Sequence, residues 1–174
     1  MIYFGEIHLA GILFVVFPSL TRGLVFVRSA HVLRITLLKI QEFHPEHREA
    51  VVSLWNTVFP NPAPHNDPQQ SIDQKTAIND GLFFVAIEDE TVVGTILGGY
   101  DGHRGWIYSV AVSPDRQRQG IGTKLIRHAE SVLIERGSPK INLQVRSDNA
   151  EVVAFYQTLG YRVEERIGMG KIVV

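Results

Sequence analysis

The 174-residue chain contains no cysteine. This absence excludes disulfide bonds and thiolate metal sites, and it removes the side chain best suited to a covalent acyl-enzyme intermediate. An excess of charge of either sign is also lacking, because 17 Lys and Arg against 18 Asp and Glu give a formal net charge of -1. No bulk electrostatic attraction to nucleic acid or to an acidic membrane is therefore expected.

An uninterrupted apolar run of membrane-spanning length is likewise missing. Residues 1–33 contain the runs "IHLAGILFVVF" and "GLVFV", but Pro18, Arg22 and Gly23 break them. A basic region does not precede the first run, as it would in a signal peptide. Three interpretations stay open: a packed element, a membrane-associated segment, or an upstream extension outside the natural fold. We favour a packed element or an upstream extension. The folded domain is then expected over 34–174. We expect no membrane partner and a cytoplasmic location.

The pattern of apolar residues from position 34 onward is typical of one mixed α/β domain. Alternation and helical spacing predict the order β-α-α-β-β-β-α-β-α-β, in which the last β stands for two closing strands, with a loop over the proline-rich residues 60–68. Short turns after residues 88 and 100 indicate an antiparallel meander. Asp148 and Glu151 predict a capping box. The strands are expected at 34–40, 82–88, 91–100, 106–112, 140–146, 161–166 and 171–174, and the helices at 44–59, 70–80, 123–137 and 148–160.

A glycine loop, "RQRQGIGTKL" at 116–125, lies between a predicted strand and the long helix. Gly120 and Gly122 would let backbone N–H groups at a helix N-terminus approach an anion. Two phosphate motifs are excluded, because Thr123-Lys124 reverses the P-loop order and Leu125 stands where a dinucleotide fingerprint needs glycine. By itself, the loop fits a close strand–helix turn without a ligand equally well.

A second motif favours a ligand. "QRQGIG" fits the pattern Gln/Arg-x-x-Gly-x-Gly/Ala, and "SDNAEVVAFYQTLGY" follows it. With both motifs present, residues 34–174 resemble the GNAT (Gcn5-related N-acetyltransferase) family. The resemblance implies a mixed, mostly antiparallel central sheet flanked by helices, with central strands that splay apart to admit coenzyme A. It also implies acetyl-CoA as cosubstrate.

The resemblance further implies roles for individual residues. Tyr156 would be the general acid that protonates the departing thiolate, and the N–H of Val110 would donate to the thioester oxygen. Tyr156 could instead be a core aromatic that serves packing. Asn149, which the resemblance places against the pantetheine arm, could instead simply cap its helix. The remaining implied coenzyme A contacts are backbone of Val110 and Val112, the loop backbone of Gln117, Arg118, Gln119, Gly120, Ile121 and Gly122, the Thr123 hydroxyl and the Asn149 side chain.

A general base for the acceptor amine is not evident. Trp106 and Gln144 occupy the positions at which some members of the resembled family carry a catalytic glutamate, and neither side chain can serve as a base. Asp101, His103, Tyr108 and a water chain are the candidates that remain. Turn formation is the commoner role for Asp101 and His103, and packing is the commoner role for Tyr108.

The first two helices and their loop would wall the acceptor pocket. This places Trp55, Asn66 and Asp67 at its edge, with core packing or turn formation as their alternatives. His44 and His47 are closely spaced but lack a third ligand nearby, so no metal site is predicted.

We therefore expect an acyltransferase that moves acetyl from acetyl-CoA directly to a primary amine, on a small molecule or a peptide, within a ternary complex. The alternative is a non-catalytic acyl-CoA-binding regulatory domain, against which the presence of Tyr156 argues. Nucleic acid is not an expected partner, and a homodimer stays open.

Overall fold

The computed structural model describes residues 8–9, 12–13 and 37–173. The chain divides into two compact units, residues 1–36 and 37–174. In the first unit, β1 (His8–Leu9) pairs antiparallel with β2 (Ile12–Leu13). The rest of the predicted N-terminal segment, and the start of the strand predicted at 34–40, lie outside the described residues. In the described part of the chain, no helix has both the length and the apolar character needed to cross a membrane.

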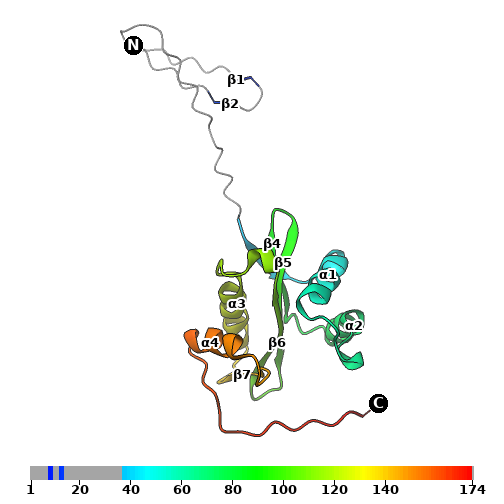
Figure 1. Ribbon diagram of the computed structural model, residues 1–174, viewed down its shortest axis with the longest axis vertical. Coiled ribbons are helices and arrows are strands. Elements are labelled where there is room, and N and C mark those ends of the chain that lie inside the picture. Colours follow the sequence, from blue (N-terminus) through cyan, green and yellow to red (C-terminus); the bar gives the residue numbers. More distant parts are fainter. Residues whose placement is uncertain (1–7, 10–11, 14–36, 174) are drawn as a thin grey trace, which may run out of the picture. The chain divides into compact units, whose positions relative to one another are not determined.

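The second unit is built on a five-stranded sheet in the order β3-β4-β5-β6-β7. Every neighbouring pair is antiparallel except β6 and β7, which run parallel. Figure 1 shows this sheet nearly edge-on, with helices on both sides. The predicted meander and the single crossover connection are both present. The strands are β3 (Lys39–Glu42), β4 (Phe83–Glu88), β5 (Thr91–Tyr100), β6 (Gly105–Val112) and β7 (Ile141–Leu143).

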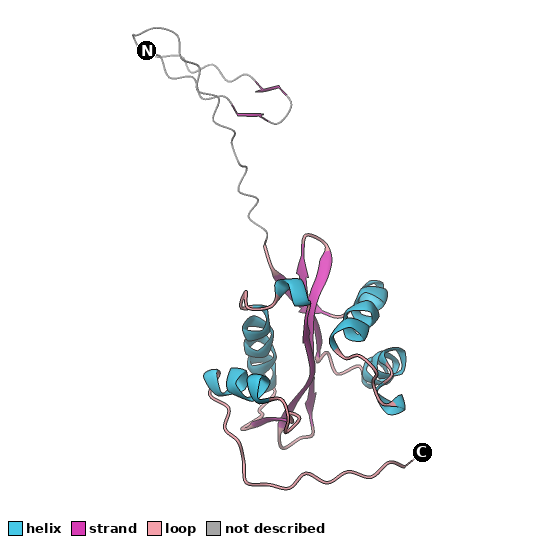
Figure 2. Ribbon diagram, viewed as in Figure 1, coloured by secondary structure: helices cyan, strands magenta, loops and turns pink. Residues whose placement is uncertain are grey.

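Helices α1 (Arg48–Val58) and α2 (Pro68–Ile78) cover one face of this sheet, and α3 (Ile121–Glu135) and α4 (Ala150–Thr158) lie on the other (Figure 2). The alternation of side chains along β4 supplies both faces. Phe84 packs into the cluster on the α3 side, whereas its neighbour Phe83 packs into the cluster that contains Val51 and Ile72. The sheet is therefore buried on both sides.

Several predicted boundaries are wrong by a few residues. The long helix begins at Ile121, two residues earlier than expected, because Gly120 adopts a left-handed conformation with φ of 80°. Asn149, not Asp148, caps α4. The second helix ends at Ile78, followed by the left-handed Asn79, instead of continuing to residue 80. The first helix is preceded by a 3-10 turn, Pro45–His47.

Other differences concern regions that the sequence pattern described poorly. The loop predicted at 60–68 contains a 3-10 turn, Pro64–Asn66, and its last residue begins α2. The strand predicted at 140–146 covers three residues only. The prediction of closing strands at 161–166 and 171–174 is wrong for the described residues of both segments, which are irregular chain. Alternating side chains favour a strand, but a strand also needs a neighbour whose backbone it can pair with.

Close packing of α3 on the sheet requires a glycine on β5. A Cβ added to Gly94 would lie 2.9 Å from Leu125 Cδ1 and 3.1 Å from the Ala111 carbonyl oxygen. A Cβ added to Gly98, on the same strand, would meet Leu82 at an ordinary 3.5 Å. The two positions therefore differ in available space more than in secondary structure.

We predict that Gly94→Ala lowers the free energy of unfolding by about 1–3 kcal/mol, because the backbone carbonyl cannot move away from the new methyl group. The matched variant Gly98→Ala should change it by less than about 1 kcal/mol, since alanine suits a strand at least as well as glycine. Urea unfolding followed by circular dichroism measures both values. Equal losses in the two variants would contradict the packing argument.

Candidate active site

The sheet opens between β6 and β7. These strands pair at Gly105–Ile141, Trp106–Asn142 and Ile107–Leu143 only, and β6 then continues to Val112 without β7 beside it. A cavity of about 480 Å³ lies at this opening. It is lined by Trp106, Ile107, Tyr108, Ser109 and Gln144.

A β-bulge in β6 lies beside the opening. Leu97 pairs with Tyr108 and Thr95 with Ala111, so two residues of β6, Ser109 and Val110, stand opposite one residue of β5. Ser109 has a φ of 48°, which is uncommon for a residue other than glycine. Such bulges turn the neighbouring backbone groups away from the regular ladder. The N–H and C=O groups that follow are therefore aimed differently from those of a regular strand.

The bulge is held from the α1 side by two linked hydrogen bonds. The Trp55 indole N–H donates to the Thr95 hydroxyl at 2.8 Å, and that hydroxyl donates to the Ser109 carbonyl at 3.4 Å. Trp55 is 3% exposed. The structure thus places Trp55 in the core and not at the edge of a pocket, which corrects the sequence expectation.

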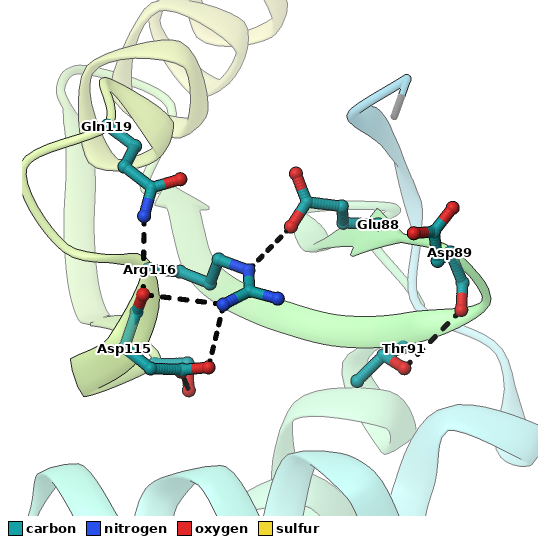
Figure 3. A network of polar contacts seen from close by, with 7 residues as sticks. Glu88, Asp89, Thr91, Asp115, Arg116 and Gln119 are labelled. Carbon is teal, nitrogen blue, oxygen red and sulfur yellow. Dashed lines mark hydrogen bonds and ion pairs between the residues drawn. The ribbon is translucent and has the colours of Figure 1, made fainter. Parts of the chain in front are cut away.

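The segment between β6 and α3 is braced by a polar network (Figure 3). Arg116 Nε donates to Glu88 Oε2 at 2.6 Å, and Arg116 also bonds the Asp115 carboxylate at 2.8 Å. Gln119 donates to the Asp115 carbonyl at 3.2 Å. These bonds tie the loop to the end of β4. Because its charge already faces two carboxylates, Arg116 adds less attraction for an anion than the sequence suggested.

Helix α3 has an open N-terminus. Gly120 is its N-cap residue, and no side chain caps the helix there, whereas Asp67 caps α2 and Asn149 caps α4. The first N–H groups of a helix lack partners within the helix and carry a partial positive charge. The arrangement suits an anion. Thr123 lies inside the first turn and does not open the helix.

The loop also contacts α4. Arg118 has a φ of 61°, and its guanidinium forms an ion pair with Glu151 on α4. A Cβ added to Gly122 would lie 3.4 Å from Phe155 Cζ and 3.7 Å from Val112 Cγ2. The glycine loop, the end of β6 and α4 therefore converge at one place.

Tyr156 lies at this convergence. It is 8% exposed and belongs to the same apolar cluster as Ile121, against which Val110 and Val112 pack. Burial raises the pKa of the Tyr156 hydroxyl to about 12. The ring contacts Tyr161 in a T-shaped pair, with 5.5 Å between centroids. Asn149 accepts a hydrogen bond from the Val152 N–H at 3.2 Å, so its capping role is real, and its amide nitrogen remains a donor.

The residues predicted for the acceptor side are not brought together. Asp101 accepts hydrogen bonds from the N–H groups of His103 and Arg104 at 2.8 and 2.6 Å and from the Trp106 indole at 3.0 Å. These bonds, led by that of Arg104, lower the pKa of Asp101 to about 2. Asp101 is thus a turn residue and a very weak base, which corrects its candidacy.

Asn66, Asp67 and His103 are exposed, and Asp67 is occupied as the α2 cap, with its carboxylate 2.9 Å from the Gln70 N–H. Of the residues predicted for the acceptor, Tyr108 alone is among those that line the cavity. His47 is buried and accepts a hydrogen bond from the His44 N–H at 2.9 Å. Among the described residues, no three His, Asp or Glu side chains are grouped so as to hold a metal ion.

Sequence reasoning missed a buried charged cluster under the cavity wall. Lys75 is 4% exposed, and its ammonium group bonds both Asp80 carboxylate oxygens, at 2.8 and 2.7 Å, and the Gly98 carbonyl at 2.6 Å. The sequence spacing could have indicated this cluster, because Lys75 follows Ile72 by three residues and shares the buried stripe of α2. A buried lysine on such a stripe needs a carboxylate or carbonyl partner.

Comparison with known proteins agrees with this geometry. The model of the acetyltransferase (GNAT) family matches residues 48–161. An acetyltransferase of Yersinia pestis is 39% identical over 137 residues, covering 79% of this chain and 96% of the relative.

Solved structures share the fold. An aminoglycoside N-acetyltransferase AAC(6')-Iy in complex with CoA aligns with a TM-score of 0.67 and 18% identity, over 81% of this chain and 98% of that chain. Ard1 from Thermoplasma volcanium aligns with a TM-score of 0.65 and 26% identity, over 73% and 84%.

The parted strands, the open helix N-terminus beside a glycine loop and the similarity to named acetyltransferases lead to one conclusion: this chain is an acyltransferase and belongs to the GNAT acetyltransferase family.

Proposed function

We propose that the protein transfers acetyl from acetyl-CoA directly to a primary amine within a ternary complex. The observation that carries the proposal is the convergence of three features: the uncapped N-terminus of α3, the end of β6 that β7 does not pair, and the buried hydroxyl-bearing ring of Tyr156. The sequence contains no cysteine that could hold the acetyl group between two half-reactions. The relatives' names support acetyl transfer, and the acceptor is our inference.

The loop backbone is suited to the diphosphate of coenzyme A. The loop over Gln117–Gly122 leads into the uncapped N-terminus of α3, where the helix dipole favours negative charge, and its N–H groups would bind the phosphate oxygens. Gly120 supplies the left-handed turn, and Gly122 leaves room between the loop and Phe155. The hydroxyl of Thr123 and the amide nitrogen of Asn149 are further donors. Bound there, acetyl-CoA supplies an activated acetyl group as its thioester.

The end of β6 is suited to the pantetheine arm, because its backbone faces a gap where a parallel neighbour would otherwise pair. Amide groups of the arm would take the place of that strand at Val110 and Val112. The Val110 N–H, redirected by the bulge at Ser109, would donate to the thioester oxygen as negative charge develops. A fixed backbone donor needs no reorganisation during the reaction.

In the chemical step, the amine nitrogen forms a bond to the carbonyl carbon and the carbon–sulfur bond then breaks. The Tyr156 hydroxyl would give its proton to the departing thiolate and regain one from solvent. A phenol with a pKa of about 12 gives up its proton less readily than a thiol of about 8.5. Tyr156 would therefore hydrogen-bond the sulfur early and transfer the proton only as negative charge accumulates there.

The amine's own proton must leave to water. Asp101 is committed to three hydrogen bonds, and Gln144 and Trp106 at the cavity are not bases. Burial, with a smaller effect of Asp80, raises the pKa of Tyr108, so this hydroxyl is protonated at neutral pH. We infer that solvent in the open cavity accepts the proton. Because acetyl-CoA is a metabolite of the cytoplasm, we place the reaction there, on an amine-bearing small molecule or peptide.

Two glycines at opposite ends of α3 provide a matched test of the loop. Gly120 and Gly137 have φ values of 80° and 87°, and a Cβ would meet no atom within 4 Å at either. Alanine should cost each about 1–2 kcal/mol of stability through backbone strain. Only Gly120→Ala should weaken acetyl-CoA binding, by about tenfold in Kd, because it alone displaces the phosphate-facing N–H groups. Isothermal titration calorimetry measures the affinity, and equal effects of both variants would refute the assignment.

Tyr156→Phe should leave the Kd of acetyl-CoA unchanged and lower kcat about 100-fold or more, because the proton donor is lost while the ring still packs. Free thiol release measures turnover on an amine panel of kanamycin, spermidine and a hexapeptide with a free N-terminus. Tyr161→Phe, at the neighbouring ring, is the control and should lower kcat by less than about threefold. Unchanged turnover in Tyr156→Phe would remove it as the acid.

The pH profile gives an independent check. An acid must be protonated to act, and Tyr156, with its pKa raised to about 12, is protonated throughout the range from pH 6 to 10. The rate should therefore rise with pH as the amine loses its proton, and it should not fall again below pH 10 through ionisation of Tyr156. Tyr156→Phe should show the same shape at a lower rate. A falling limb below pH 10 that disappears in this variant would contradict the raised pKa of Tyr156, while leaving its role as the acid in place.

A further inference from the structure

Lys75 and Tyr108 meet at one backbone carbonyl. The Lys75 ammonium donates to the Gly98 oxygen at 2.6 Å, and the Tyr108 hydroxyl donates to the same oxygen at 3.3 Å. The Lys75 nitrogen also lies 5.9 Å from the centroid of the Tyr108 ring, within the range of a cation–π contact. The tyrosine is thus held at its hydroxyl and at its ring.

The Tyr108 ring packs over Gly99 of β5. A Cβ added to Gly99 would lie 3.6 Å from Tyr108 Cε1 and 3.8 Å from its hydroxyl oxygen. Asp80 completes the arrangement, because its carboxylate bonds Lys75 and also accepts the Leu82 N–H at 3.0 Å. Lys75 is therefore fixed by a carboxylate that the backbone itself orients.

A buried ammonium group is costly to maintain, since it must be removed from water and then fully hydrogen-bonded. Burial also lowers the pKa of Lys75, despite its bonds to Asp80. An apolar side chain would fill the same position on the α2 stripe without that cost. The lysine also fixes the position of Tyr108, which an apolar side chain at position 75 could not do in the same way.

The position of Tyr108 gives that geometry a use. Its side chain is 42% exposed and lines the cavity at the opening between β6 and β7. Tyr156 packs on the α3 side of the sheet, whereas Tyr108 contacts a residue of α2. If Tyr156 serves the leaving sulfur, the incoming amine must reach the carbonyl from another direction, and the cavity that Tyr108 lines offers one.

We propose that Tyr108 forms a wall of the acceptor site and that Lys75, with Asp80, is a positioning residue that fixes this wall. The inference rests on the proposed function, because it assumes an amine acceptor. It assigns a purpose to two residues, Lys75 and Asp80, that lie on the opposite side of the sheet from the glycine loop.

The positioning of Tyr108 can be tested without an acceptor. In protein labelled with ¹³C-tyrosine, Tyr108→Phe identifies the Tyr108 signal by its disappearance among five tyrosines. Lys75→Met should shift or broaden this signal and leave the Tyr156 signal in place. Lys39→Met, at an exposed position on β3, is the matched control and should move neither. An unshifted Tyr108 signal in Lys75→Met would overturn the proposal.

The acceptor role is tested by kinetics on the panel amine that the parent enzyme acetylates fastest. Lys75→Met and Tyr108→Leu should each raise the KM for that amine about tenfold, with the KM for acetyl-CoA changed less than about twofold. The double variant should be no worse than the more affected single variant, because both remove the same wall. An unchanged amine KM, or fully additive effects, would overturn the proposal.

Folding and function can be separated in these experiments. Asp80 is partly exposed, with 24% of its side chain accessible, so water can solvate it when Lys75 is replaced. If Lys75→Met does not fold, Asp80→Asn keeps the lysine and should produce the same shift of Tyr108 and the same rise in amine KM. If the parent enzyme acetylates no amine, the proposed function fails, and the labelling experiment still decides whether Lys75 positions Tyr108.

Discussion

The parting of β6 from β7 after three paired residues is the constraint on which the rest of the structure depends. A central strand that loses its neighbour leaves backbone groups that something else must satisfy. The bulge at Ser109 falls just where the pairing ends, and the glycine loop starts where β6 ends. Under the proposed function, an extended, amide-bearing cosubstrate would occupy this interruption in the sheet.

In the proposed function, the two faces of the sheet serve different substrates. On the α3 side, an open helix end, a braced loop and Tyr156 suit the cosubstrate and its leaving group. On the α2 side, Tyr108 lines the cavity, and Lys75, paired with Asp80, contacts its ring. β5 packs against both sides: Gly94 allows the close approach of α3, and Gly99 lies in ordinary contact with the ring of Tyr108.

The sequence predicted the meander and the crossover helix, because periodicity and turn motifs are local signals, whereas the link between the glycine loop and Tyr156 was implied only by the family resemblance. It missed contacts between distant segments. The link of Arg116 to Glu88 joins residues 28 positions apart, and no spacing rule predicts it. Asp101 was one candidate base, with turn formation as its commoner role, and only the structure shows the three hydrogen-bond donors that commit it to the turn. The bulge depends on register between strands, which a single strand does not encode.

The bond from the Trp55 indole to Thr95 limits how this scaffold can be reshaped. Thr95 is fully buried, and its hydroxyl passes the contact on to the bulged backbone. Replacing Trp55 by a smaller residue would remove the donor to that hydroxyl, which keeps its bond to the Ser109 carbonyl, and would weaken the support of the bulge. Enlarging the pocket from the α1 side would therefore disturb the bulge. Substituting Gln144, which lines the cavity beside the end of β7, would change the pocket without touching this hydrogen bond.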